Sequence, residues 1–221
     1  MNKKVAVIFD MDGVICHTNP YHSLAFREFF STRNLSPTEE EFALHMYGKS
    51  NSYILSHFLN RPIQGEELLK LEDEKESLFR KIYEPHIDPV AGFSTFIADL
   101  AAHDVELGVA TSAPYANLEL ILSKVNIREQ LGSILASEDV NKHKPDPEVY
   151  LKSARNLGVD PKQCIVFEDS FSGVSAALNA GMKVVGVLTS HKIEELPKCD
   201  FYINDYLDLN YEKLYSILMK D

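Results

Sequence analysis

This sequence of 221 residues lacks long apolar runs, an excess of basic residues and a cysteine framework. No apolar run approaches the length of a membrane-spanning helix, and the N-terminal run at residues 5–9 is too short for a secretion signal. The formal net charge of −11 argues against nucleic acid or an anionic membrane as the main partner, because either would favour a basic face. Three cysteines without metal-ligand spacing suit a reducing compartment. We therefore expect a cytoplasmic protein. We also expect a monomer rather than an oligomer.

Short apolar runs rich in β-branched residues recur along the chain. They lie at residues 5–9, 107–110, 133–136, 164–167, 184–187 and 201–203. Most do not alternate with polar residues, which is typical of strands buried on both faces of a parallel sheet. Helical patterns lie between most of them, at 93–103, 116–125, 147–157 and 172–180, and Gly158 and Gly181 follow the last two as stop signals. This alternation predicts an α/β fold with a doubly wound parallel sheet.

The stretch from residue 17 to residue 85 interrupts the alternation. It has no convincing strand, and it carries helical patterns at 20–33, 37–46, 50–60 and 65–83. Ser36 is the predicted N-cap of the second pattern, followed by Pro37 at the first helical position and by Glu39. We expect residues 17–85 to form a helical cap subdomain, inserted after the first strand of a core made of residues 1–16 and 86–221.

Two carboxylates, Asp10 and Asp12, follow the first predicted strand, and Gly13 allows a sharp turn there. A carboxylate beside a metal can attack phosphorus, while a second one protonates the leaving oxygen and deprotonates water. The sequence from Asp10 to Gly13 is also compatible with an ordinary turn or with the start of a calcium-binding loop. A calcium loop needs further oxygen ligands where Val14 and Ile15 stand, so that alternative fails.

Polar residues also follow the second predicted strand, at Thr111 and Ser112. Their hydroxyls and backbone N–H groups could hold phosphoryl oxygens, although Ser and Thr are equally common as helix caps. Farther along, Lys142 and Lys144 compete as the point cation for a phosphate, and either could be a solvated loop lysine.

Glu168 and Asp169 end the predicted strand at 164–167. Hard oxygen ligands of this kind suit Mg²⁺, although an acidic loop before a helix capped by Ser172 is the plain alternative. Ligands of open parallel sheets bind beyond the carboxyl ends of the strands. Four strand ends that together supply a nucleophile, an acid/base, a phosphate clamp, a cation and metal ligands therefore predict phosphoryl transfer.

These motifs resemble the haloacid dehalogenase-like superfamily, in the branch that contains β-phosphoglucomutase and sugar-phosphate phosphatases. The resemblance rests on the segments FDMDGV, VATS, KPDPE and VFEDS, and on the stretch 173–182, so it covers nearly the whole chain. It implies a Rossmann-like core with a helical cap.

The resemblance also implies residue roles. Asp10 would be the nucleophile, and Asp12 the general acid/base and a metal ligand through its carbonyl. Thr111, with Ser112, would bind phosphate. Lys144, which immediately precedes the proline, would stabilise the phosphorylated intermediate.

Asp169 would complete the Mg²⁺ site with Asp10 and Asp12, assisted by Glu168. Because members that dehalogenate lack an acid at the position of Asp12, dehalogenation is not expected.

For the cap, the resemblance implies substrate contacts from His22 and from the loop that contains Lys49 and Asn51. The mutase carries an arginine for a distal phosphate where Asn51 stands here, and Lys49 offers no bidentate fork in its place. His22 could equally be a packed helix-face residue. Cys16 and His17 are interpreted as hinge packing.

We therefore predict a magnesium-dependent phosphatase that hydrolyses a sugar phosphate or similar metabolite through an aspartyl-phosphate on Asp10. The first alternative is a phosphomutase, in which a substrate hydroxyl replaces water as the acceptor. The second is a non-catalytic binding protein on the same scaffold, because a fold does not by itself imply a function.

Overall fold

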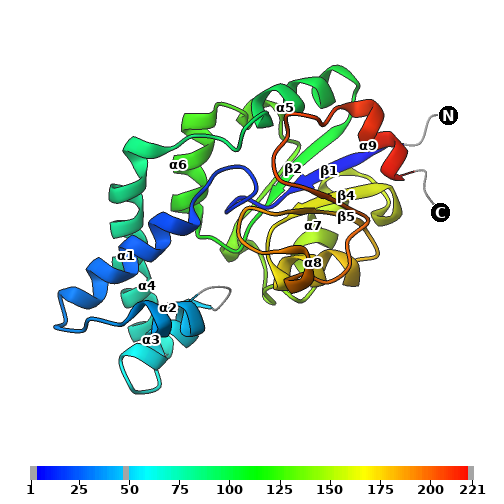
Figure 1. The fold of residues 1–221 in the computed structure, drawn as a ribbon. Helices are drawn as coiled ribbons and strands as arrows, with labels where there is room; N and C mark the ends of the chain where they lie inside the picture. Colours follow the sequence, from blue (N-terminus) through cyan, green and yellow to red (C-terminus); the bar gives the residue numbers. More distant parts are fainter. Residues whose placement is uncertain (1–3, 47–49, 219–221) are drawn as a thin grey trace. The chain divides into compact units, whose positions relative to one another are not determined.

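The computed structural model describes residues 4–46 and 50–218, and the chain divides into two compact units (Figure 1). The sheet unit comprises Met1–His17 and Ile87–Asp221, and the helical unit comprises Thr18–His86. The helical unit begins and ends one residue later than the range 17–85 expected from the sequence.

The sheet unit is built on a six-stranded sheet in the order β3-β2-β1-β4-β5-β6, with every pair parallel. The strands are β1 (Ala6–Phe9), β2 (Glu106–Ala110), β3 (Ser133–Leu135), β4 (Cys164–Glu168), β5 (Lys183–Val187) and β6 (Phe201–Ile203). Each lies within one residue of a run predicted from the sequence. The predicted α/β class with a Rossmann-like parallel sheet is confirmed.

Strand β1 lies in the middle of the sheet, and each of its two neighbours extends one residue beyond it. Phe9, its last residue, is paired with Val109 of β2 and with Phe167 of β4. The residue after β1 therefore comes level with the last residue of β4, which is Glu168. This register brings chain segments more than 150 positions apart to one edge of the sheet.

Both faces of the sheet are covered. On one face, Phe9 and Phe167 pack with Phe93, Phe96 and Tyr206, with ring centroids as close as 5.1 Å. Helices α5 (Phe93–Ala102) and α9 (Tyr211–Leu218) lie on this side (Figure 1). The continuous apolar strands follow from this two-sided burial.

The opposite face carries α7 (Glu148–Leu157) and α8 (Phe171–Asn179). There, Ile8 and Val166 belong to one buried cluster with Tyr150 and Val174. Because side chains alternate along a strand, residues two positions beyond Ile8 and Val166 continue on this face. Those residues are Asp10 and Glu168.

The remaining helices of the sheet unit include α6 (Tyr115–Val125). Single 3₁₀ turns lie at Arg128–Gln130, Ser137–Asp139, Pro161–Gln163 and Ile193–Glu195. Helix α7 ends at Gly158 in the left-handed region, as expected. The N-cap of α8 is Ser170, whose hydroxyl accepts from the Gly173 N–H, and the suggested cap Ser172 lies inside the helix. Helix α9 was not among the predicted helices.

The helical unit contains α1 (Asn19–Ser31), α2 (Glu39–His45), α3 (Asn51–Phe58) and α4 (Gly65–Tyr83), followed by a 3₁₀ turn at Glu84–His86. Its core is a cluster of aromatic and aliphatic side chains that includes Phe26, Phe29, Phe30, Phe42 and Leu55. The four helical patterns predicted between residues 20 and 83 are all present.

The predicted N-cap of α2 is wrong. Thr38, not Ser36, accepts a hydrogen bond from the Glu41 N–H at 3.2 Å, while the Glu41 carboxylate accepts from the Thr38 N–H at 2.7 Å. A capping box needs only Ser or Thr with Glu three residues later. Both Ser36 with Glu39 and Thr38 with Glu41 meet that requirement, so the sequence contains two overlapping candidates.

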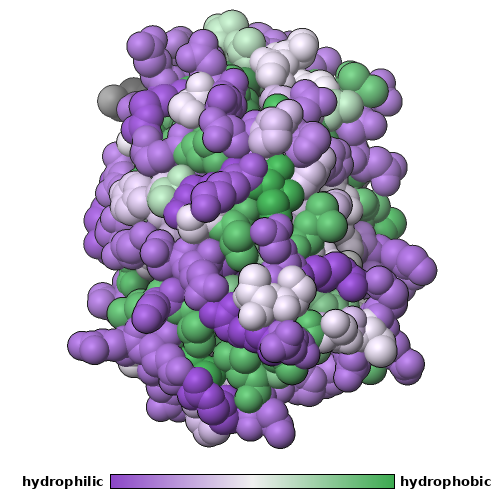
Figure 2. Space-filling view, turned by 90° about the vertical axis from the view of Figure 1, so that its left-hand side faces the viewer, coloured by the Kyte–Doolittle hydropathy of each residue, from purple (hydrophilic) through white to green (hydrophobic). Residues whose placement is uncertain are grey.

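Polar and charged residues cover most of the face shown in Figure 2, with apolar residues in patches between them. Within residues 4–46 and 50–218, no helix is long and apolar enough to cross a membrane. All three cysteines, Cys16, Cys164 and Cys199, are buried. Burial raises the pKa of the Cys164 thiol to about 12 and that of Cys199 to about 11.

Candidate active site

Asp10 lies directly after β1, at the centre of the carboxyl edge of the sheet. Its N–H still donates to the Phe167 carbonyl at 3.0 Å, so the strand register fixes its position. The turn that follows closes with a hydrogen bond from the Ile15 N–H to the Met11 carbonyl at 2.9 Å. Gly13 takes a left-handed φ of 72°, which favours glycine. The Asp10 side chain is 9% exposed, so it is not fully enclosed.

Lys144 reaches the carboxylates from the segment before α7. Its Nζ donates to Asp10 Oδ1 at 2.6 Å, to Glu168 Oε1 at 2.7 Å and to the Ala110 carbonyl at 3.1 Å. The Lys142 side chain is 73% exposed, and its Nζ lies 3.8 Å from Asp146 Oδ2. The structure thus brings Lys144 to Asp10 and leaves Lys142 at the surface.

Glu168 is enclosed by donors on both of its oxygens. Oε1 accepts from Lys144 and from the Tyr150 hydroxyl at 2.8 Å. Oε2 accepts from the N–H groups of Asp169 and Ser170 and from the Ser170 hydroxyl, each at 3.0 Å. A Cβ on Gly173 would lie 1.7 Å from Glu168 Oε1, so only glycine fits beneath this carboxylate.

Asp169 is held by the residues that follow β5. Ser190 donates its hydroxyl to Asp169 Oδ2, and His191 Nδ1 lies 2.9 Å from the Asp169 carbonyl oxygen. The Thr189 hydroxyl donates to the Gly13 carbonyl. Sequence reasoning missed all three residues. Their only signal was a polar Thr-Ser-His run after an apolar strand, which is also typical of an ordinary loop.

The buried charges do not balance. Burial raises the pKa of Asp10 well above its usual range, and the ammonium of Lys144 opposes that shift. Burial, together with Glu168, raises the pKa of Asp169 to about 8. Burial by itself would lower the pKa of Lys144, but Asp10 and Glu168 raise it above its ordinary value. The lysine is therefore charged. It is a single positive charge beside three carboxyl groups, those of Asp10, Glu168 and Asp169.

This carboxylate set fits a magnesium ion. Asp10, Glu168 and Asp169 each offer an oxygen, and these oxygens lie within 4.8 Å of one another. Hard carboxylate oxygens are what Mg²⁺ prefers. A divalent cation would also offset the burial and the neighbouring carboxylates that raise the pKa values of Asp10 and Asp169.

The other predicted residues of the sheet unit lie at the same edge. Asp12 is partly buried in the turn and forms an isolated bridge with Cys16. Thr111 is 2% exposed, and its hydroxyl accepts from the Ala113 N–H at 3.0 Å. Ser112 is exposed. The hydrogen bond at Thr111 shapes the turn after β2, so the residue has a structural role besides any contact with phosphate.

The helical unit contains its own polar cluster. His22 stacks on Phe79 with centroids 3.7 Å apart, and its Nδ1 lies 2.9 Å from Lys75 Nζ. Lys75 donates to Glu76 Oε1 at 2.7 Å, and Asn51 Nδ2 donates to the same oxygen at 3.1 Å. Sequence reasoning missed Lys75 and Glu76, which lie in a run of charged residues that resembles a solvated helix face. The third predicted residue of this unit, Lys49, lies outside the described residues.

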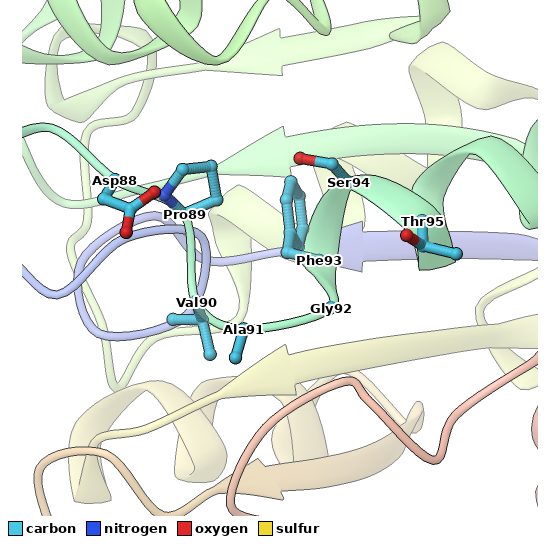
Figure 3. A pocket seen from close by; sticks show the side chains of 8 residues that line it. All are labelled: Asp88, Pro89, Val90, Ala91, Gly92, Phe93, Ser94 and Thr95. Carbon is cyan, nitrogen blue, oxygen red and sulfur yellow. The ribbon is translucent and has the colours of Figure 1, made fainter.

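None of these carboxylates lines the cavity shown in Figure 3. Its lining, residues 88–95, is one continuous segment that leads into α5 (Figure 3). Asp88 is the single charged side chain in that lining, and no lysine or arginine faces it. The acidic edge is the better candidate site, because side chains from four separate segments converge there with perturbed charges.

Comparisons with known proteins agree with this geometry. A model of the family described as haloacid dehalogenase-like hydrolase matches residues 7–187. The chain is 31% identical to a β-phosphoglucomutase of Bacillus subtilis over 191 residues, covering 82% of each chain. It is 28% identical to a fructose-1-phosphate phosphatase of Escherichia coli over 181 residues, covering 82% of this chain and 95% of that one.

A solved structure has the same fold. The haloacid dehalogenase-type hydrolase of family IA, variant 3, from Entamoeba histolytica superposes with a TM-score of 0.92 at 28% identity. The match covers 98% of this chain and 100% of that chain. The resemblance predicted from the sequence is confirmed, and the chain belongs to the haloacid dehalogenase-like hydrolase family as a phosphohydrolase.

Proposed function

We propose that the protein is a magnesium-dependent phosphatase that hydrolyses a small phosphate ester, a sugar phosphate or similar metabolite, through an aspartyl-phosphate on Asp10. The observation that carries the proposal is the position of the Asp10 carboxylate, 2.6 Å from Lys144 Nζ at the end of the central strand. The similarity to enzymes named as a phosphatase and a phosphomutase supports it.

In this proposal Asp10 attacks phosphorus and the bond from phosphorus to the ester oxygen breaks. Asp12 gives a proton to the departing oxygen, so an alcohol leaves. Asp12 then takes a proton from water, and the water oxygen attacks phosphorus while the bond from Asp10 to phosphorus breaks. Inorganic phosphate leaves, Asp10 is again a carboxylate and Asp12 is again protonated.

The other residues of the site would stabilise the negative charge of Asp10 and of the phosphoryl group. Lys144 neutralises Asp10 and the transferring phosphoryl group, while Thr111 and Ser112 hold phosphoryl oxygens. Asp10, Asp12 and Asp169 would hold Mg²⁺, with Glu168 assisting, and the metal when bound neutralises phosphoryl charge. His22, Lys49 and Asn51 remain candidates for substrate recognition.

Phosphate release from a panel of phosphorylated metabolites, with and without Mg²⁺, tests the proposal. We expect release with at least one sugar phosphate, and loss of roughly four orders of magnitude or more in Asp10→Asn, because the amide is a poor nucleophile. Circular dichroism should show that the variant keeps the fold. Substantial activity in Asp10→Asn would place the nucleophile elsewhere.

The similarity to a β-phosphoglucomutase makes a phosphomutase the second candidate. Glucose 1-phosphate with a catalytic amount of glucose 1,6-bisphosphate separates the two activities. A hydrolase should release free phosphate. Glucose 6-phosphate formed without free phosphate would show that a substrate hydroxyl, and not water, accepts the phosphoryl group.

A further inference from the structure

Three consecutive residues after β5, Thr189, Ser190 and His191, all contact the two acidic turns of the site. We call them the β5 loop. Thr189 donates to the carbonyl of Gly13, and His191 Nδ1 lies 2.9 Å from the carbonyl of Asp169. For that contact to be a hydrogen bond, the imidazole must carry its proton on Nδ1. Both contacts hold backbone, so they fix the loop without changing the charge of the site.

Ser190 differs from its two neighbours because it contacts a side chain. Its hydroxyl donates to Oδ2 of the Asp169 carboxylate. Asp169 is 4% exposed, whereas Ser190 is exposed. The hydroxyl therefore reaches inward from the surface to a buried acid.

The backbone of Gly13 also restricts the position of Asp169 Oδ2. A Cβ placed on Gly13 would lie 2.0 Å from this oxygen and 2.9 Å from the Ser190 hydroxyl. The turn after β1, the end of β4 and the β5 loop thus meet at one carboxylate oxygen. The carboxylate cannot rotate far without breaking the bond to Ser190 or meeting the Gly13 backbone.

The coordination chemistry of divalent cations gives this restraint a consequence. Mg²⁺ requires near-ideal octahedral geometry with ligands at about 2.0–2.1 Å, and it keeps several waters. Ca²⁺ takes roughly 6–8 oxygens at about 2.3–2.6 Å and readily uses both oxygens of one carboxylate. A carboxylate with one oxygen engaged by a hydroxyl suits the first ion better than the second.

We propose that Ser190 determines the metal preference of the site, because its bond to Oδ2 makes Asp169 a one-oxygen ligand that favours Mg²⁺ over Ca²⁺. Thr189 and His191 position Ser190 by fixing the loop to backbone carbonyls. The inference rests on the proposed function, in which Asp169 is a metal ligand, and it adds a residue that selects the ion.

The test is the affinity of the full chain for each ion, measured by calorimetric titration of metal-stripped protein with MgCl₂ and with CaCl₂. In Ser190→Ala we expect the Mg²⁺ affinity to fall by about tenfold, which is typical when a group that orients a ligand is removed. The Ca²⁺ affinity should stay the same or rise, so the preference for Mg²⁺ over Ca²⁺ should fall about tenfold or more. Because Ser190 is exposed, the substitution removes little packing.

Two control variants make the measurement specific. Ser190→Thr keeps a hydroxyl at the same position and should keep most of the preference. Ser123→Ala removes another exposed hydroxyl of the sheet unit, which donates to the Leu120 carbonyl at 2.8 Å on α6, and should leave both affinities unchanged.

The possible failures are distinguishable. If the wild-type chain binds neither ion, the proposed metal site itself is wrong. If the wild type prefers Mg²⁺ and Ser190→Ala shows the same ratio of affinities, the metal site stands and the role given to Ser190 is overturned. A parallel tenfold loss for both ions would make Ser190 a support for the metal and not a selector.

Discussion

At the scale of single residues, Glu168 and Asp169 are adjacent in the sequence and held in different ways. Glu168 accepts from five donors, and two of these are the side chains of Lys144 and Tyr150. For Glu168 to ligate a metal directly, at least one of these hydrogen bonds would have to break. We therefore expect Asp169 to bind the metal and Glu168 to keep Lys144 beside Asp10.

The prediction at this scale concerns Gly13, whose φ is 72° and whose missing Cβ would lie 2.0 Å from Asp169 Oδ2. Gly13→Ala should lower the free energy of unfolding by about 3 kcal/mol, because backbone strain adds to a clash with a confined carboxylate. It should also weaken Mg²⁺ binding. Denaturant unfolding and calorimetric titration measure the two effects.

Gly181→Ala is the matched control, because Gly181 has a φ of 74° and open space where its Cβ would be. It should cost only the backbone strain, about 1 kcal/mol, and leave Mg²⁺ binding intact. Equal losses of stability in both variants would show that the clash at Gly13 is relieved by small shifts.

The residue scale also shows what the sequence could not reveal. Asp10 and Asp169 were identifiable as candidates because each is an acid directly after a predicted strand, and Lys144 because it immediately precedes a proline in a segment that resembles the family. The β5 loop was not, since hydroxyl residues follow many strands. The partners of Thr189 and Ser190, which are Gly13 and Asp169, are set by strand order and not by nearby sequence.

At the scale of elements, strands were predictable to within one residue because both faces of the sheet are buried. Such strands must be continuous apolar runs, and this pattern can be recognised in the sequence without knowing which strands are adjacent in the sheet. Helix starts were less predictable. The overlapping signals at Ser36 and Thr38 are local, and the choice between them is made in three dimensions.

The prediction at this scale is that Thr38→Ala destabilises the first turn of α2 by about 1 kcal/mol, the usual cost of losing an N-cap hydroxyl. Ser36→Ala should change stability by less than about 0.5 kcal/mol, since Ser36 lies before the helix. Hydrogen exchange of the α2 amides measures the local effect. A larger loss in Ser36→Ala than in Thr38→Ala would restore Ser36 as the cap.

At the scale of the whole molecule, a chain with a net charge of −11 is proposed to bind an anionic substrate. The general field of the protein opposes that binding, so attraction has to be local. Lys144 supplies one buried positive charge, and the carboxylates beside it would supply more through a divalent cation. In the proposed function, acidic residues would thus bind an anionic ligand through the metal ion that they hold.

The prediction at this scale follows from the raised pKa values of Asp10 and Asp169. An acid whose pKa is higher in the folded state favours folding when protonated, so stability is lost as the pH rises from the unfolded value of about 4 toward the folded value. For Asp169 the folded value is about 8. In EDTA, the thermal midpoint should therefore fall between about pH 5 and pH 8.

Saturating Mg²⁺ should flatten that slope, because the cation replaces the protons as the partner of the carboxylates. Scanning calorimetry at several pH values, with EDTA and with Mg²⁺, makes the comparison. The Asp169→Asn variant is the control and should show a shallower slope in EDTA. Parallel curves with and without Mg²⁺ would contradict the proposed coupling between protons and metal.

The burial of all three cysteines has a practical consequence for labelling. Thiol reagents attack the thiolate, and burial also raises the pKa of Cys164 and Cys199. The three buried thiols should therefore react only when the fold opens. The rate at which the native cysteines are alkylated therefore reports how often the fold opens and exposes them. Leu69 and Leu207 are 66% and 69% exposed. If a cysteine replaces either of them, a thiol-reactive fluorophore should label only that cysteine, and the three native cysteines need not be removed.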